Sequence, residues 1–270
     1  MELEEYLLIL TFNIYMNIFK RSLQFLFLIL IFSCSGSKKN FDISLKDKFD
    51  SGMSNLEKGK YLQAQVDFND VLLRGTGSEL GDDAQYFLGE AYYQNNEYLD
   101  AITEFEKLTR RMGFSEYVEK ARFKICEAYK IESPKYYHDQ EYTVKALERY
   151  QEFIDDYPNS EYIEIIMVSI EELRNKLAEK LYQTGILYIK MEEFESAKIA
   201  FNEAINTYYD TDIIHKLYQG LIITLSKNLE VEKAYEILKK HESSLKQYNL
   251  YSDALSSIDI GKNKLRKGEK

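Results

Sequence analysis

The chain has 270 residues, of which 45% are hydrophobic and 30% are charged, a balance that is ordinary for a protein with a folded core. This composition argues against disorder for most of the chain. A formal charge of -10 argues against nucleic-acid binding, because an acidic surface repels phosphate backbones. Two prolines and 12 glycines leave few of the turn residues that β-sandwiches need, so the composition favours an all-α fold.

The amino-terminal segment has the order of a secretory signal, in which charge precedes a hydrophobic run. The basic pair Lys20-Arg21 is followed by a run from Leu23 to Phe32 that is apolar apart from one glutamine. A run of about 10 residues is too short to cross a hydrocarbon core that needs about 20. Met16 is an in-frame alternative start that would leave out the acidic residues before it.

From Met16 onward, the segment resembles a bacterial lipoprotein signal with the lipobox Ile31-Phe32-Ser33-Cys34. The resemblance implies that residues 1–33 are a signal peptide and that Cys34 carries acyl chains after cleavage. Several acyl chains hold a protein on a bilayer where one chain would not. Residues 34–41 would then be the lipidated cysteine and a flexible tether. The alternatives are an uncleaved anchor or a buried cysteine.

The rest of the chain contains one pattern that recurs about five times. Each copy has a small residue in a first helix, an aromatic residue before a turn, and then alanine and an aromatic residue four positions apart in a second helix. The last copy, around Tyr218 to Leu238, is degraded. Antiparallel helix pairs need small residues where backbones approach and bulky ones that fill the remaining space. The pattern resembles the tetratricopeptide repeat and implies an α-solenoid of about five helical hairpins. The second-helix alanines are Ala64, Ala101, Ala146, Ala197 and Ala234.

The steps between these alanines are 37, 45, 51 and 37 residues, so the two middle steps predict insertions. The first insertion is a loop from Ile131 to Glu141, because Pro134 cannot continue a helix. The second is a long helix over about Glu161 to Lys190, which keeps an apolar face. The expected domains are N-terminal repeat units 1–3 over 42–160, C-terminal units 4–5 over 161–243, and a C-terminal tail over 244–270.

Aromatic residues of the repeats are predicted to form the core, and no chemistry-bearing cluster stands beside them. Cys126 takes the place that Gly89 has in the preceding unit, so we interpret it as a small buried residue and not as a nucleophile. No motif places a serine or cysteine near His138-Asp139. The sequence therefore predicts no catalytic residue, no cofactor and no metal site. The predicted core aromatics are Phe68, Tyr98, Phe105, Tyr150 and Phe201.

The first insertion and the segment after it carry a more specific resemblance, to the BamD family of lipoproteins from the outer-membrane β-barrel assembly machine. The resemblance runs from the lipobox to about residue 243, and both insertions stand where that family has them. The residues that carry it are Ser133-Pro134, His138-Asp139-Gln140, Thr143, Ala146, Phe153, Tyr157-Pro158-Asn159-Ser160 and Leu173-Arg174-Asn175-Lys176-Leu177-Ala178.

This resemblance implies a non-enzymatic scaffold that a lipid anchor holds at the periplasmic face of the outer membrane. Ser35 after the cysteine, where aspartate is absent, is in keeping with transport to that membrane. The implied partners are the POTRA domains of the barrel-forming BamA subunit, unfolded outer-membrane protein segments, and other assembly lipoproteins. The alternative is another periplasmic repeat lipoprotein that coordinates envelope constriction or peptidoglycan synthesis.

Indexing the repeats predicts a peptide groove along the first helices, on the concave side of the solenoid. Aromatic residues recur there, and rigid rings give contact area with little loss of rotamer entropy. Such a groove would bind apolar or aromatic-ended segments of unfolded barrels. The alternative, which the sequence leaves open, is that the rings pack between repeats. The candidate groove residues are Phe49, Met53, Tyr86, Glu90, Tyr93, Phe123, Glu127 and Tyr182.

Overall fold

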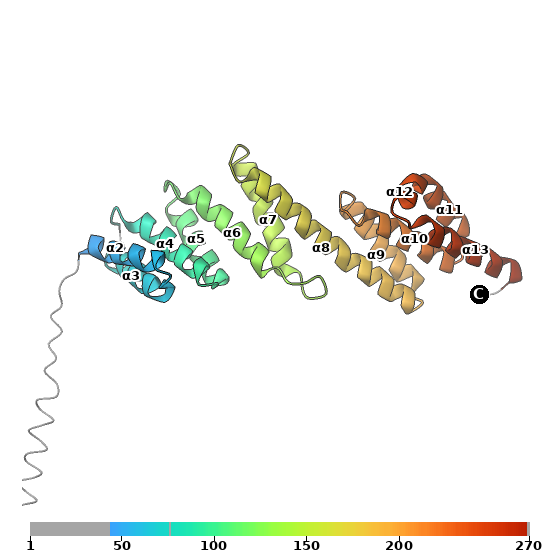
Figure 1. The fold of residues 1–270 in the computed structure, drawn as a ribbon, viewed down its shortest axis with the longest axis horizontal. Helices are drawn as coiled ribbons and strands as arrows, with labels where there is room; N and C mark the ends of the chain where they lie inside the picture. The colour runs from blue at the N-terminus through green and yellow to red at the C-terminus, as the bar shows by residue number, and fades with distance from the viewer. Residues whose placement is uncertain (1–43, 76, 269–270) are drawn as a thin grey trace, which may run out of the picture. The chain divides into compact units, whose positions relative to one another are not determined.

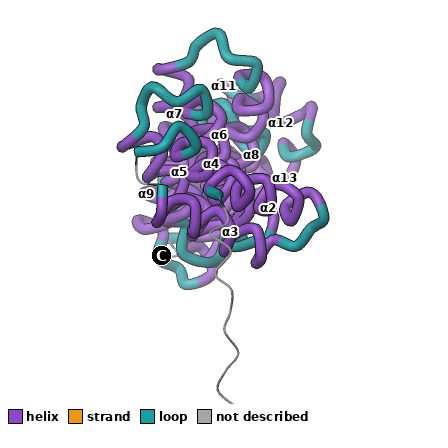
Figure 2. Tube along the Cα trace, turned by 90° about the vertical axis from the view of Figure 1, so that its left-hand side faces the viewer, coloured by secondary structure: helices purple, strands orange, loops and turns teal. Residues whose placement is uncertain are grey.

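The computed structural model describes residues 44–75 and 77–268, and all regular secondary structure within these ranges is helical (Figure 2). This confirms the predicted all-α fold. The chain divides into two units between Ser44 and Leu45, and every described helix belongs to the second unit. The helices are α2 (Leu45–Glu57), α3 (Tyr61–Arg74), α4 (Gly81–Gln94), α5 (Tyr98–Arg111), α6 (Val118–Glu132), α7 (Glu141–Asp156), α8 (Ile163–Lys190), α9 (Phe194–Thr207), α10 (Ile214–Lys227), α11 (Val231–Lys240), α12 (Glu242–Gln247) and α13 (Tyr251–Lys267).

Successive helices from α2 to α11 form hairpins that stack in chain order, each second helix also contacting the next first helix (Figure 1). Tight turns of one geometry close most of these hairpins. Gly59, Asn96, Glu192 and Leu229 each adopt a left-handed backbone, with φ of 61–70°. At Asn96 the next N–H, of Glu97, donates to the Tyr92 carbonyl at 3.0 Å, which satisfies a carbonyl at the helix end.

The second-helix alanines are all fully buried, which confirms the predicted repeat register and with it the tetratricopeptide-type solenoid. Opposite the first four of these alanines, a small first-helix residue makes room for the bulky residue that follows. A Cβ atom on Gly89 would lie 2.6 Å from the Phe105 ring, so only glycine fits there. In the third hairpin, Cys126 takes this place beside Tyr150, and it is buried as predicted.

Tyr98 is only partly buried, so its assignment to the core was wrong. It is the first residue of α5, next to the turn, where its hydroxyl donates to Asn96 Oδ1 at 2.7 Å. A tyrosine at a helix start can keep its polar end in water while its ring packs on a neighbour. The other four predicted core aromatics are fully buried: Phe68, Phe105, Tyr150 and Phe201.

The first insertion is a loop that α8 helps to hold in place. α6 ends just before Pro134, as predicted. Within the loop, the buried Gln140 side chain donates to the Lys135 carbonyl at 2.9 Å. From α8, the Lys176 ammonium donates to Ser133 Oγ at 2.7 Å. Burial lowers the pKa of Lys176, although neighbouring Glu172 acts against this shift.

The second insertion is α8 itself, which belongs to two layers of the stack. Its first half packs on α6 and α7 through Ile166 and Leu173, in the cluster that contains Tyr150. Its second half is the first helix of the fourth hairpin and packs on α9 through Leu181 and Ile186. One continuous helix therefore joins the front units to the back units.

The C-terminal segment, predicted as a tail, is helical through most of its length. α12 and α13 are joined by a turn of the same geometry as the hairpin turns. Asn249 is left-handed there, and the Leu250 N–H donates to the Leu245 carbonyl at 2.8 Å. α13 covers α10 closely, because a Cβ on Gly261 would lie 2.6 Å from the Ser226 carbonyl oxygen.

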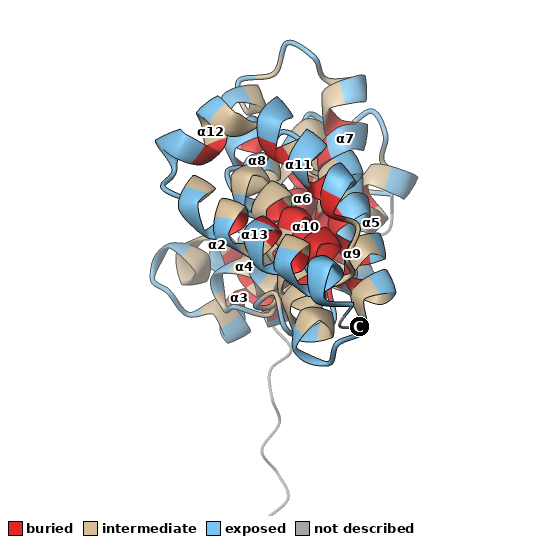
Figure 3. Ribbon diagram, turned by 90° about the vertical axis from the view of Figure 1, so that its right-hand side faces the viewer, coloured by how far each residue is buried: buried red, intermediate tan, exposed pale blue. Residues whose placement is uncertain are grey.

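α10 is among the most enclosed helices, with α9, α11 and α13 around it (Figure 3). The interpretation of residues 244–270 as a tail missed α13 because only three of the 17 residues of that helix are buried: Ala254, Ile258 and Gly261. Within the described residues, no helix combines the length and apolar content that crossing a membrane requires.

Candidate partner-binding surface

The predicted groove residues lie on four successive first helices. One of them, Tyr86, is buried with 8% exposure, and the other seven are partly buried. Phe49 and Met53 come from α2, Tyr86, Glu90 and Tyr93 from α4, Phe123 and Glu127 from α6, and Tyr182 from α8.

The aromatic members also act as spacers between hairpins. The Tyr86 ring stacks on Tyr117 with centroids 4.4 Å apart, and the Phe123 ring stacks on Tyr162 at 4.1 Å. Tyr117 and Tyr162 are the residues that precede α6 and α8, so each groove ring is covered by the start of the following first helix. Burial, with help from Asp83, raises the pKa of Tyr117 to about 12. One face of each stacked ring is therefore occupied by packing.

The polar members tie neighbouring hairpins together. Glu90 forms an ion pair with Lys124 of α6 at 3.1 Å, and the same ammonium lies 4.2 Å from the centroid of the Tyr93 ring. Burial, followed by the nearby Glu127, raises the pKa of Tyr93 to about 12. Glu127 itself accepts a hydrogen bond from the Tyr150 hydroxyl. These contacts hold the side chains of the candidate groove in fixed positions.

Sequence reasoning missed Tyr117, Tyr162 and Lys124 as parts of this surface. A signal for the two tyrosines was present, because Ser115-Glu116-Tyr117 and Ser160-Glu161-Tyr162 are the same tripeptide, 45 residues apart. In both copies the serine Oγ accepts the N–H of the tyrosine, at 3.3 and 3.2 Å. No comparable pattern marks Lys124.

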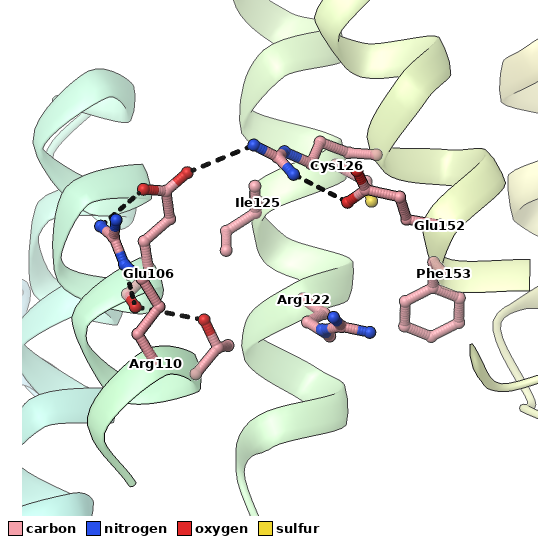
Figure 4. Close-up of a pocket in the computed structure, with 9 residues that line it drawn as sticks. Glu106, Arg110, Arg122, Ile125, Cys126, Glu152 and Phe153 are labelled. Carbon is pink, nitrogen blue, oxygen red and sulfur yellow. Dashed lines mark hydrogen bonds and ion pairs between the residues drawn. The ribbon is translucent and has the colours of Figure 1, made fainter. Parts of the chain in front are cut away.

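A separate hollow of about 210 Å³ lies between α5, α6 and α7 (Figure 4). Arg149 reaches Glu152 at 2.7 Å and Glu106 at 3.8 Å, while Arg110 binds Glu106 at 2.8 Å. The arginines are thus neutralised by carboxylates, and the network links α5 to α7. Cys126 lines the hollow, where burial raises the pKa of its thiol and so disfavours the reactive thiolate.

The described residues bear on the predicted lipid attachment and on metal binding only to a limited extent. Cys34 lies outside the described residues, so its lipid attachment stays a prediction. Within the described residues, no three histidine, cysteine, aspartate or glutamate side chains are grouped as metal ligands.

A family model described as an outer membrane lipoprotein, YfiO, matches residues 42–245. The chain belongs to this family. The match covers the hairpins from α2 to α11 and the start of α12.

Curated relatives of this chain carry the name outer membrane protein assembly factor BamD. This confirms the predicted resemblance to the BamD family. The relative from Rickettsia prowazekii is 22% identical over 229 aligned residues, and the alignment covers 80% of this chain and 88% of the relative. The relative from Vibrio cholerae is 24% identical over 198 residues, covering 69% of this chain and 82% of the relative.

Solved structures of repeat proteins also align with the chain. The TPR2AB domain of yeast Sti1, in its complex with pHSP90, is 16% identical with a TM-score of 0.40, covering 82% of this chain and 90% of that one. The MamA protein is 17% identical with a TM-score of 0.33, covering 75% of this chain and 94% of that one.

Proposed function

We propose that this chain is a non-enzymatic scaffold for outer-membrane protein assembly. Membership of the YfiO family and the curated relatives named BamD are the main support. The stacked hairpins also support a binding role, because solenoids of this kind expose long surfaces to other chains. In this proposal the protein brings a barrel-forming subunit and its unfolded clients together at the outer membrane.

The proposed partner is a BamA-like barrel protein, bound through its POTRA domains, with other assembly lipoproteins as further members. We expect that the tagged, full-length chain recovers a POTRA-bearing barrel protein from detergent-solubilised envelopes, as identified by mass spectrometry. The same pull-down with an unrelated tagged outer-membrane lipoprotein is the control. Recovery of peptidoglycan synthases in place of the barrel protein would instead favour the alternative role in envelope constriction or peptidoglycan synthesis.

The proposed client site is the groove formed by the first helices α2, α4, α6 and α8. Tyr93 is its most informative residue, because it is partly exposed and held in place by Tyr98, at 5.3 Å between ring centroids, and by Lys124. A ring held in one orientation loses little entropy when an apolar segment packs on it. Strands of unfolded barrels have apolar residues at alternate positions and aromatic residues at their ends. Such segments could pack their apolar side chains on the rings of this groove.

Replacing Tyr93 by alanine is expected to weaken binding of a synthetic, Phe-ended peptide with alternating apolar residues by roughly two- to tenfold, since one aromatic contact contributes roughly 0.5–1.5 kcal/mol. Fluorescence anisotropy with the labelled peptide measures this affinity. Tyr209→Ala is the matched control, because Tyr209 is 69% exposed in the segment between α9 and α10. Equal affinities for the wild type and a folded Tyr93→Ala variant would argue that the rings serve packing alone.

The proposed anchor is a set of acyl chains on Cys34, which would keep the scaffold at the periplasmic face of the outer membrane. Mass spectrometry of the mature amino terminus is expected to find a lipid-modified Cys34 as the first residue. A mature protein that begins with any other, unmodified residue would refute the anchor without affecting the proposed partner.

A further inference from the structure

The first half of α8 has the local structure of α6, displaced by 45 residues. The shared Ser-Glu-Tyr tripeptide opens both helices with the same hydrogen bond, which the tyrosine backbone N–H donates to the serine Oγ. The tyrosine stacks on the preceding first helix in both cases, Tyr117 on Tyr86 and Tyr162 on Phe123. The start of α8 is therefore built as the first helix of a further hairpin.

That hairpin has no second helix among the described residues. On α6, the second helix α7 covers Cys126 and packs Tyr150 against it. The residue of α8 that is equivalent to Cys126 is Glu171, and it is exposed. The next helix, α9, instead pairs with the second half of α8.

The uncovered face forms a shallow hollow of about 300 Å³, which we call the α8 seat. Met167 and Val168 are 54% and 55% exposed in it, although large apolar residues on a helix are normally turned inward. One wall is fixed, because Arg174 binds Asp210 at 2.6 Å and the Thr207 carbonyl at 2.8 Å. The seat is lined by Met167, Val168, Ile170, Glu171, Arg174, Asp210 and Thr211.

We propose that the α8 seat binds an amphipathic helix of a partner protein, in the place that α7 takes on α6. A helix fits because the seat is a helix face, whose backbone groups are already hydrogen-bonded and cannot pair with an extended strand. The proposal rests on the scaffold role only in requiring a partner chain. The α8 seat shares no residue with the candidate groove of α2, α4, α6 and α8.

The charges around the seat define the chemistry of the partner helix. Glu164 and Glu171 lie two turns apart on the exposed face, on either side of Val168, and neither is paired with a cation of the described residues. The other nearby charges are already matched, since Glu172 binds Lys130 at 2.8 Å and Asp210 binds Arg174. The partner helix should therefore carry an apolar stripe flanked by lysine or arginine.

Two synthetic peptides of about 16 residues test this chemistry, since they share one leucine stripe and differ only in lysine or glutamate at the flanking positions. We expect the lysine-flanked peptide to bind the detergent-solubilised full-length chain about tenfold more tightly than the glutamate-flanked peptide. Val168→Glu should weaken its binding about tenfold. Ile199→Glu should leave it unchanged, because Ile199 is equally apolar, 66% exposed and lies on α9 outside the seat.

A charge reversal sharpens the test. In the double variant Glu164→Lys, Glu171→Lys, the preference should invert in favour of the glutamate-flanked peptide. Equal binding of both peptides, or unchanged binding by Val168→Glu, would overturn the proposal. Equally tight binding of a proline-containing, non-helical version would assign the seat to extended segments. Loss of a wild-type dimer in Val168→Glu, measured by sedimentation, would assign it to a second copy of the chain.

Failure of the α8 seat proposal and failure of the proposed function would give different experimental results. Val168→Glu should still bind the Phe-ended client peptide, whereas Tyr93→Ala should still bind the lysine-flanked helix. If the seat binds its peptide but the full-length chain recovers no POTRA-bearing protein, only the assembly role fails.

Discussion

Replacing Phe201 by alanine is expected to lower the free energy of unfolding by about 3–5 kcal/mol. The ring is fully buried between two first helices. A Cβ on Gly185 would lie 2.5 Å from the ring, and Gly220 faces it equally closely from α10. Because both neighbours lack side chains, nothing can move in to fill the cavity that the smaller residue leaves.

Urea unfolding followed by circular dichroism measures this loss. Ile199→Ala is the matched control on the same helix, because Ile199 is largely exposed, and its effect should stay within about 0.5 kcal/mol. Unfolding midpoints that coincide for the two variants would mean that the Gly185–Phe201–Gly220 contact does not stabilise the back units.

Replacing Asp67 by asparagine is expected to lower the free energy of unfolding by roughly 1.5–3 kcal/mol at neutral pH. The Asp67 carboxylate of α3 is 1% exposed and receives three hydrogen bonds from α2. Lys48 Nζ donates at 2.9 Å, and Ser51 Oγ and Asn55 Nδ2 each donate at 2.8 Å. Asparagine keeps the shape but removes the charge that these donors stabilise, and it leaves the Lys48 ammonium without its partner.

The effect of Asp67→Asn should depend on pH. Burial alone would raise the pKa of Asp67, but the donors Lys48, Ser51 and Asn55 outweigh it and hold the pKa below its ordinary value of 3.8. A carboxyl with a lowered folded-state pKa stabilises the fold above its ordinary pKa, and this contribution is lost as the pH falls through the folded-state pKa. The wild type should therefore exceed Asp67→Asn by a constant amount above about pH 5, and the gap should shrink in stronger acid.

Urea midpoints of the two proteins across this pH range provide the measurement. Asp70→Asn serves as the control, because Asp70 forms only a surface pair with Arg74, at 3.1 Å on the same helix. A stability gap that stays constant well below pH 3.8 would show that the carboxylate charge at Asp67 is not what holds α2 on α3.

The repeat register and the end of α6 follow from the sequence, because each depends on residues close together in the chain. The alanine series predicted which residues face the core, and Pro134 predicted the end of α6. Even the degraded fifth unit obeys the register, since Ile222 and Leu238 are buried where other units place glycine or cysteine and an aromatic residue. A small residue facing an aromatic one and an isoleucine facing a leucine fill the same space between two helices. The repeat pattern therefore encodes the filling of that space.

Only the tertiary structure decided which surfaces stay open. Composition and periodicity describe a residue on its own helix, but exposure depends on which distant helix covers it. Tyr86 is buried because Tyr117, 31 residues later, stacks on it, while Val168 is exposed because α9 packs on the second half of α8. Because α8 belongs to two layers of the stack, part of its apolar face is left uncovered. Which part is uncovered depends on how the hairpins stack.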